Sequence, residues 1–428
     1  MFVSPDDSFI FATQLDVFQT CTCGPAGVSA CTQMYCPPSK DDEPSDKALK
    51  DCSWQKIEPP ETKRRFGHHA HVNGDSMVVT FLDRPVKYVY VYKLNANGKW
   101  RLDQKVGDDD VAFGDGYGFQ YADISLNGKY LAITGKEADS DGKENNGVVL
   151  VYEKDGDGQY RKVAHFEGEE EGDLFGNNIA LTGDTLLVGA RRANNDRGVV
   201  YAYRRKGPGK WERYGPMLVA SDGAKGDMFG RRINYKGQTA VVASLSNGDA
   251  KGFGDGKSIY VFDDDRGNGS DDGRGFSETQ KLLPDDPDDL QSFGFKIDID
   301  FFANTIVVGA KRKNGKGVAY VFTRKDNGAW TQTAKLKPNS YNSDAAMQFG
   351  SDVAVEGDII LVNALSKEGP GLVYVFKGHG SDWKQELLLS REDGFGDSLD
   401  IYRNTAAIGA PGEDGDSGAV YMVDFCEE

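Results

Sequence analysis

The sequence is poor in histidine, and its cysteines avoid most of the chain. Only 5 histidines occur among 428 residues, and the cysteines lie within residues 21–52 or at Cys426. No apolar run approaches the roughly 20 residues of a membrane-spanning helix. No basic segment followed by an apolar stretch opens the chain, as it would in a signal peptide. We therefore expect no membrane span, and either a cytosolic protein or a mature form whose signal has been removed.

Familiar catalytic motifs and an excess of basic charge are also lacking. The sequence contains no Gly-x-Ser-x-Gly turn, no phosphate-binding Walker loop and no zinc-protease helix. Asp and Glu outnumber Lys and Arg by 67 to 50, which gives a formal net charge of −17. This balance opposes nonspecific attraction to nucleic acid or anionic membranes and favours cations. We expect no nucleic-acid partner.

A unit of about fifty residues recurs along the chain. Residues 175–204, FGNNIALTGDTLLVGARRANNDRGVVYAYR, show its short β-rich runs between Gly, Asp and Asn turns, a pattern that favours antiparallel hairpins. Seven copies are marked by a phenylalanine: Phe66, Phe119, Phe175, Phe229, Phe293, Phe349 and Phe395. Such a unit cannot bury both faces alone, and its repetition is typical of propeller blades. The sequence predicts an all-β fold, a seven-bladed β-propeller of four-stranded antiparallel blades.

The repeated motifs resemble a known family. Phe-Gly, then Gly-Asp, then Val-Gly-Ala, with Gly-Ala-Pro itself at residues 409–411, are similar to the FG-GAP repeat over about residues 52–426. The second copy departs from the pattern, because Phe119-Gln120 replaces Phe-Gly. The resemblance implies the seven-bladed propeller of integrin α-subunits and of many extracellular proteins. It does not identify a site, since sites are grafted onto such folds.

The ends of the repeat region predict how the ring closes. The last copy ends after its third strand, at Phe425, whereas residues 53–57 have the pattern of a fourth strand, Ser-Trp-Gln-Lys-Ile. We expect this N-terminal strand to complete the last blade and remove an exposed edge. Two domains follow from this: a Cys-rich extension and linker over residues 1–51, and the propeller over residues 52–428.

The even number of cysteines predicts disulfides and an oxidising compartment. Antiparallel pairing of the closing strand brings Cys52 close to Cys426, so we expect a disulfide between them. The alternative is that Cys426 bonds another molecule and Cys52 pairs locally. Four cysteines are expected in local bridges: Cys21, Cys23, Cys31 and Cys36. Cys21-x-Cys23 is too tight for the usual zinc pair, and a bridge between these two neighbours is disfavoured. We expect an extracellular or cell-surface location.

Two acidic loops between second and third strands are candidate calcium sites. Oxygen donors at alternate positions around a glycine turn suit Ca²⁺. The candidate ligands are Asp139, Asp141, Glu144, Asp414 and Asp416. Neither loop has the full integrin-type pattern, Asp-x-Asp-x-Asp-Gly with a further Asp. Calcium is the one cofactor that the sequence suggests.

Three of the five histidines cluster at residues 68–71, His-His-Ala-His. His69 and His71 share one face of an extended strand, and the corresponding positions in other blades are polar, among them Arg232. These positions favour a hydrated channel with a polar lining. The alternative is a two-histidine metal site or a catalytic site.

Two functions fit these features. The first is a non-enzymatic extracellular binding or scaffold propeller that holds protein or glycan, with calcium, in adhesion or a larger extracellular assembly. The second is a polysaccharide lyase or hydrolase at the channel mouth, since some polysaccharide lyases are seven-bladed propellers. It would use His69, His71 and Arg232 with a carboxylate. A lyase should gather Arg or Lys, Tyr and His there to bind a uronate and remove its α-proton. The acidic composition opposes an anionic substrate, so we expect the first function and no catalysis.

Overall fold

The computed structural model describes residues 49–427 with gaps, together with four short strands in residues 2–28. The gaps are residues 62–63, 84–85, 114–115, 117, 126–127, 246–255, 266–274, 287–291, 301, 303, 312–315, 340–347, 366–369 and 392–393. The chain divides into two compact units, Met1–Asp46 and Lys47–Glu428.

The first unit contains one antiparallel sheet with the strand order β1, β2, β3, β4. Its strands are β1 (Phe2–Val3), β2 (Ser8–Phe11), β3 (Gln19–Gly24) and β4 (Gly27–Val28). Cys21 and Cys23 lie on β3, whereas Cys31 and Cys36 lie outside the described residues. The local bridges therefore stay a prediction.

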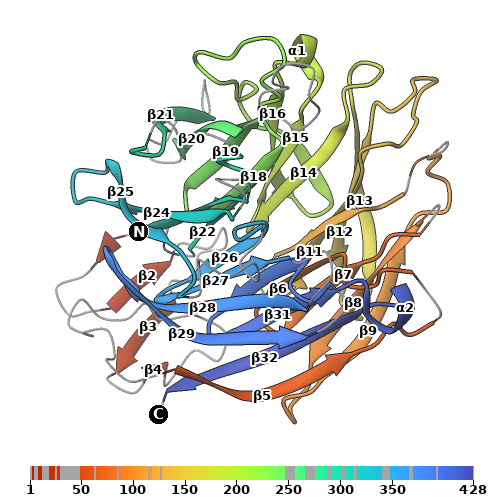
Figure 1. Ribbon diagram of the computed structural model, residues 1–428. Coiled ribbons are helices and arrows are strands. Elements are labelled where there is room, and N and C mark those ends of the chain that lie inside the picture. Colours follow the sequence, from red (N-terminus) through yellow and green to blue (C-terminus); the bar gives the residue numbers. More distant parts are fainter. Residues whose placement is uncertain are drawn as a thin grey trace. The chain divides into compact units, whose positions relative to one another are not determined.

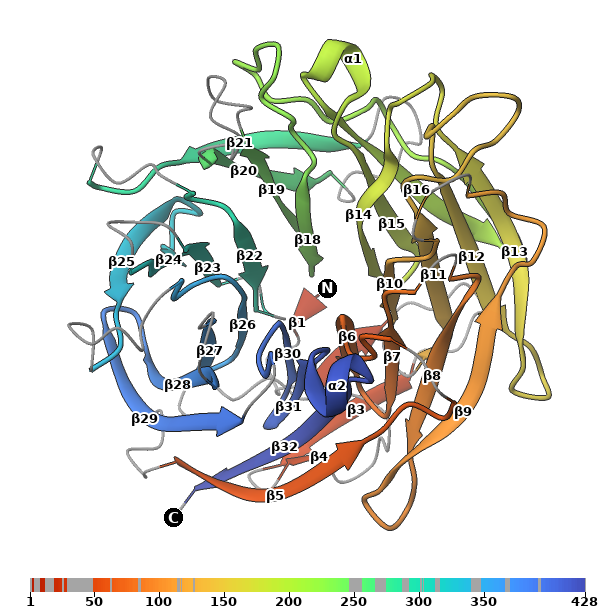
Figure 2. The ribbon, with the colours of Figure 1, turned by 45° about the vertical axis from the view of Figure 1, so that its right-hand side comes forward.

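The second unit is a ring of seven four-stranded antiparallel sheets (Figures 1 and 2), which confirms the predicted fold class. From the inner to the outer strand, the first three blades are β6 (His69–Asn73), β7 (Ser76–Thr80), β8 (Tyr88–Leu94) and β9 (Trp100–Gly107); β10 (Tyr121–Ile124), β11 (Tyr130–Gly135), β12 (Val148–Lys154) and β13 (Tyr160–Glu167); β14 (Phe175–Thr182), β15 (Thr185–Ala190), β16 (Val199–Gly207) and β17 (Lys210–Arg213). The next three are β18 (Arg232–Lys236), β19 (Thr239–Leu245), β20 (Gly256–Asp264) and β21 (Phe276–Leu282); β22 (Lys296–Ile299), β23 (Thr305–Ala310), β24 (Val318–Arg324) and β25 (Trp330–Leu336); β26 (Val353–Glu356), β27 (Ile359–Ala364), β28 (Gly371–His379) and β29 (Asp382–Arg391). The seventh is β30 (Ser398–Tyr402), β31 (Thr405–Ala410), β32 (Ala419–Glu427) and β5 (Leu49–Ile57).

Among the described residues the α-helices are two single turns, α1 (Ala193–Asp196) and α2 (Glu413–Asp416). Each lies between the second and third strands of its blade and contains residues with positive φ, such as Asn194 with a φ of 56°. Neither is long or apolar enough to cross a membrane, and the same holds for every helix in the described part of the chain.

The Phe-Gly and Gly-Ala motifs allow neighbouring blades to touch. Phe66 is fully buried, and its ring centroid lies 6.0 Å from that of Tyr90 in the same blade. Gly67 has a φ of +85°, and a Cβ there would collide with the backbone of Ala419 in the seventh blade. A Cβ at Gly409 would likewise collide with the carbonyl of Gly67. The two motifs recur together because each removes a side chain from the same contact between blades.

The hydrophobic core lies between the blades. Each buried cluster joins the facing sides of two adjacent sheets, as where Met77 and Val79 of β7 meet Val420 and Met422 of β32. Aliphatic and aromatic side chains removed from water in this way supply the main stabilising free energy of the ring. Packing between the blades therefore fixes the inner strands. Their side chains that face the centre of the ring are not needed for this core and can be polar.

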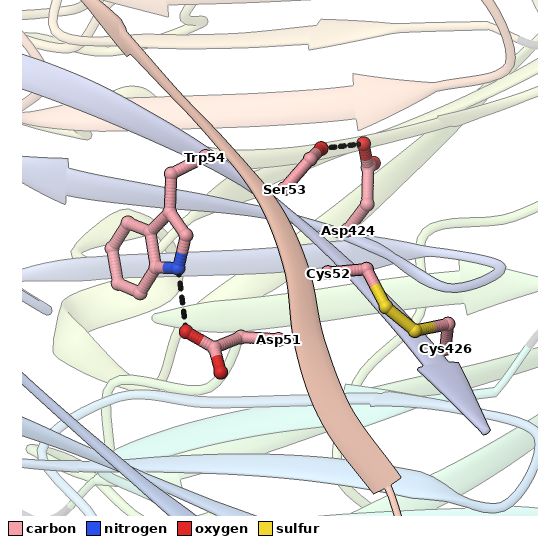
Figure 3. The surroundings of a disulfide bond; sticks show 6 residues. All are labelled: Asp51, Cys52, Ser53, Trp54, Asp424 and Cys426. Atoms are coloured by element: carbon pink, nitrogen blue, oxygen red, sulfur yellow. Dashed lines mark hydrogen bonds between the residues drawn. A yellow bond between two sulfur atoms is a disulfide. The ribbon is translucent and has the colours of Figure 1, made fainter. Parts of the chain in front are cut away.

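The ring closes through β5, which pairs with β32 as the outer strand of the seventh blade. This confirms the predicted closure by an N-terminal strand. The strand extends back to Leu49, whose side chain is buried in the seventh-blade cluster. A disulfide joins Cys52 to Cys426, with 5.9 Å between their Cα atoms (Figure 3). Beside it, the Ser53 hydroxyl donates a hydrogen bond to the carboxylate of Asp424.

Candidate functional site

The seven inner strands surround the centre of the ring (Figure 2), and side chains from them line a central channel. Because every blade has the same strand order, the inner strands all start at one end of the channel, which we call the mouth. The side chains that line the cavity there are His69, Tyr121, Asn178, Arg232, Lys296 and Asp352. The cavity has a volume of about 100 Å³. A cavity of about 150 Å³ holds benzene in another protein, so this one suits a small group or part of a sugar ring.

His71 lies one layer below the mouth, between two carboxylates. Its Nε2 lies 2.8 Å from Oδ1 of Asp123, and its Nδ1 lies 2.9 Å from Oδ2 of Asp400. Burial on its own lowers the pKa of His71, but the two carboxylates outweigh burial and raise this pKa to about 10. His71 is therefore a cation at neutral pH, and its two ring nitrogens are engaged.

The carboxylates beside His71 also join adjacent blades. Asp400 accepts a hydrogen bond of 2.6 Å from the backbone N–H of Val72, and Asp123 accepts one of 2.7 Å from that of Leu181. Each bond crosses from one inner strand to the next. His71, Asp123 and Asp400 therefore have a structural role in joining the inner strands. This role accounts for the position of His71 without any catalytic task.

Asp298 and Lys236 lie farther along the channel. Asp298 accepts hydrogen bonds from the side-chain amide of Asn234 and from the backbone of Val355. Burial raises the pKa of Asp298 to about 7, with Lys236 opposing the rise and Asp400 adding to it. Burial lowers the pKa of Lys236, but nearby carboxylates, Asp400 foremost, outweigh it and raise that pKa. Lys236 thus balances the acidic side chains inside the channel.

Positive charge gathers at the mouth. Five cationic side chains act electrostatically on Tyr121 and form what we call the basic mouth: Lys136, Arg191, Arg231, Arg232 and Lys296. Burial, together with repulsion from Arg232 and Arg191, lowers the pKa of Arg231 to about 10. These cations therefore lie close enough to destabilise one another, and a bound anion would relieve that repulsion.

Three carboxyl groups lie among these cations. Asp352 pairs with Lys296 at 2.9 Å, and Glu137 lies 4.0 Å from Lys136. Burial raises the pKa of the third, Asp397. The cations outnumber the carboxyl groups, so the basic mouth keeps a positive charge within a protein whose formal charge is −17.

Several nitrogen atoms at the mouth are buried without a hydrogen-bond partner in the described part of the chain. They are Nδ1 of His68, Nδ1 of His69 and Nε of Arg191. Burial, followed by the charge of Lys296, holds the pKa of His69 well below its usual range, so this imidazole is neutral. Of these three residues His69 lines the cavity. Buried polar groups are nearly always paired, so its unpaired nitrogen is suited to a polar ligand.

Tyr121 stands at the centre of the basic mouth. The His69 and Tyr121 ring centroids lie 5.6 Å apart, edge to face, and Lys136 Nζ lies 6.0 Å from the Tyr121 ring centroid. Arg232 lines the same cavity as Tyr121, and its guanidinium donates hydrogen bonds to the backbone carbonyls of Phe295 and Arg231. Burial on its own raises the pKa of Tyr121, but Arg232, Lys136 and Lys296 outweigh it and lower this pKa to about 8.

The predicted calcium ligands lie in two separate loops. Asp139 Oδ1 accepts a hydrogen bond of 2.8 Å from the backbone N–H of Asn145. Asp414 Oδ2 lies 2.9 Å from Lys56 Nζ, and Asp416 lies 3.7 Å from Arg65. Among the described residues, no three His, Cys, Asp or Glu side chains are grouped so that they could hold a metal ion. Calcium binding stays a prediction from the sequence.

Comparison with known proteins identifies the family. The FG-GAP repeat matches residues 167–203, 217–262, 276–322, 330–376 and 390–423. The chain is an FG-GAP repeat protein. The matches cover five successive blades, and the structure shows the same blade twice more, in residues 69–107 and 121–167.

Solved structures resemble this FG-GAP propeller in fold alone. A chain of the mitotic checkpoint complex is 10% identical with a TM-score of 0.53, and the alignment covers 92% of this chain and 99% of that one. A Bacteroides uniformis protein described as a candidate 6-phosphogluconolactonase is 10% identical with a TM-score of 0.51, over 76% of this chain and 86% of that one. No curated protein matches the sequence.

The structure brings His69, His71 and Arg232 to one channel. Tyr121 lines the same channel, but it was not predicted from the sequence as a site residue. It follows the degenerate Phe119-Gln120 pair, where the FG-GAP register is hardest to follow. The cations that follow the second strands of two blades were not predicted either, although the repeat offers a pattern that locates them. Lys136 and Arg191 each come directly after a second strand, where Pro411 stands in the Gly-Ala-Pro copy.

Proposed function

We propose that this protein is a binding propeller that holds an acidic glycan at its basic mouth. The observation that carries the proposal is the convergence of Arg191, Arg231, Arg232 and Lys296 on one end of the channel in an otherwise acidic protein. Arginine and lysine side chains fixed in this way are suited to carboxylate or sulfate groups, which they bind through charge-assisted hydrogen bonds.

A glycan suits the mouth better than a folded protein does. The cavity is small and concave, and its lining adds uncharged donors and acceptors to the cations, including Asn178, Tyr121 and neutral His69. Sugar hydroxyls need such groups as hydrogen-bond partners. One acidic sugar residue at the mouth leaves the rest of a glycan chain to lie over the loops around it.

An extracellular or cell-surface location belongs to the same proposal. The Cys52–Cys426 disulfide supports it, because structural disulfides persist in oxidising compartments. Membership of the FG-GAP repeat family supports a role in binding. Such a propeller would act in adhesion or in the assembly of extracellular material, with calcium at the acidic loops as an additional prediction.

Titration calorimetry with acidic and neutral oligosaccharides tests this proposal. We expect acidic chains to bind, neutral chains of the same length to bind far more weakly, and affinity to fall as salt screens the charges. Arg232→Gln should weaken binding by about 10- to 100-fold, the range that corresponds to the loss of one charge-assisted hydrogen bond.

Arg161→Gln is the matched control for that variant. Arg161 lies on β13, the outer strand of its blade, and its side chain is 68% exposed. Its loss should leave affinity unchanged. Equal binding of neutral and acidic glycans, or an Arg232→Gln variant that binds as well as the wild type, would refute the proposal.

A further inference from the structure

The basic mouth also holds the groups that remove a proton beside a carboxylate. We infer that Tyr121 is the catalytic base of a β-elimination that cleaves a uronate-containing glycan bound there; this inference rests on the proposed function. Tyr121 is the first residue of β10 and lines the cavity together with His69, Arg232 and Lys296. Its ring centroid lies 5.6 Å from that of His69.

The reaction makes two demands on a site. The proton on C5 of a uronate, next to the carboxylate, is only weakly acidic, so the carboxylate charge must be neutralised and a base must lie close by. Arg232 and Lys296 are the cations that line the cavity at the mouth, and both also act on Tyr121. Because Arg232 and Tyr121 line the same cavity, a carboxylate held by Arg232 brings C5 toward the phenol.

The surrounding charges favour the basic form of Tyr121. Since its pKa is lowered to about 8, about a tenth of the phenol is ionised at pH 7. The charged and titratable groups around it on neighbouring strands and turns are His68, His69, Lys136, Glu137, Arg191, Arg231, Arg232, Lys296, Asp352 and Asp397. The two histidines are neutral, because burial holds the pKa of each below its usual range. The remaining groups are mostly cations that stabilise a phenolate.

The elimination balances without any further reactant. The Tyr121 phenolate takes the C5 proton, and the C5–H electron pair becomes the second bond of a C4=C5 double bond. The bond between C4 and the glycosidic oxygen breaks, and its electron pair stays on that oxygen. The phenol then passes its proton to the departing oxygen, which restores the phenolate and leaves an unsaturated uronate and a shortened chain.

Hydrolysis fits the mouth less well. A glycosidase needs two carboxyl groups, one as acid and one as base or nucleophile. Asp352 is the carboxylate that lines the cavity at the mouth, and it is tied to Lys296 at 2.9 Å and to the backbone N–H of Leu399 at 3.2 Å. The other carboxylates of the cavity lie deeper in the channel, where Asp123 and Asp400 hold His71.

The test incubates the full-length protein with polygalacturonate and with alginate while recording ultraviolet absorbance, since only the conjugated double bond of the product absorbs there. Wild-type protein should form this product, at a rate that rises with pH and levels off above about pH 8. Tyr121→Phe keeps the ring and removes the hydroxyl. It should lose at least about 100-fold in rate, as expected for loss of a general base, while calorimetry shows that the polymer still binds.

Tyr402→Phe is the matched control. Tyr402 is the last residue of β30 and therefore lies at the end of the channel opposite the mouth. This variant should keep the wild-type rate. A wild-type protein that binds a uronate polymer but never forms the unsaturated product would refute the elimination and leave the binding proposal intact. Absence of binding would refute both. A folded Tyr121→Phe variant with the full rate would refute the assignment of the base. So would a wild-type rate that does not change between pH 6 and 9, a range of about one to two units on either side of the Tyr121 pKa.

Discussion

Removal of the Cys52–Cys426 disulfide should lower the free energy of unfolding of the propeller without opening the seventh blade, where β5 pairs with β32. The bond closes a loop with a sequence separation of 374 residues. In the chain-entropy model a loop of this length restricts the unfolded chain by about 6 kcal/mol at 25 °C, and measured losses are more often about 2 to 5 kcal/mol. The β5 to β32 pairing remains in the variant, so Cys52→Ser with Cys426→Ser should still fold as a closed propeller.

Urea unfolding of the double variant, beside oxidised and reduced wild type, measures this effect. We expect the double variant and the reduced wild type to unfold at the same urea concentration, and both to be less stable than the oxidised protein by about 2 to 6 kcal/mol. Peptide mapping without reductant should recover the two cysteines on one linked pair of peptides. A double variant as stable as the oxidised wild type would show that the disulfide does not restrain the ring.

Three further predictions concern closure, pH and calcium. Deletion of residues 1–46 should leave a folded monomer, whereas deletion of residues 1–58 removes β5 and should cause aggregation, as judged by gel filtration; a monomeric, heat-stable product of the longer deletion would contradict the closure. Because the pKa of His71 is raised from 6.5 to about 10 on folding, its stabilisation is complete below pH 6.5 and is lost as pH rises toward 10. Unfolding free energies of His71→Gln should therefore depend less on pH in this window, and equal slopes would contradict the ion pairs. Calcium should raise the melting temperature through loops 139–144 and 413–416, and no heat of binding together with melting that chelator leaves unchanged would contradict calcium binding there.

The blades could be predicted from the sequence because the information that specifies them is local. Phe-Gly and Gly-Ala recur within each unit, and the missing fourth strand after Phe425 points to residues 53–57 as its replacement. The same alternation placed His69, His71 and Arg232 on inward-facing positions. No longer-range contact was needed for any of these inferences.

The electrostatic site could not be predicted in this way, because it depends on which blades face one another across the ring. His71 meets Asp123 of the second blade on one side and Asp400 of the seventh blade on the other, and only ring closure brings Asp400 there. Likewise, Tyr121 acquires its lowered pKa from Arg232 and Lys296, two and three blades away. The acidic composition is unfavourable for an anionic ligand, but composition averages over the surface and does not reveal a local basic cluster.

The most direct measurement of the central claim is a crystal structure of this protein with an acidic oligosaccharide bound. We expect the sugar carboxylate at the basic mouth, within hydrogen-bond distance of the Arg232 guanidinium, and a neighbouring sugar ring against Tyr121. An oligosaccharide bound on the outer strands, with no sugar at the mouth, would contradict the account.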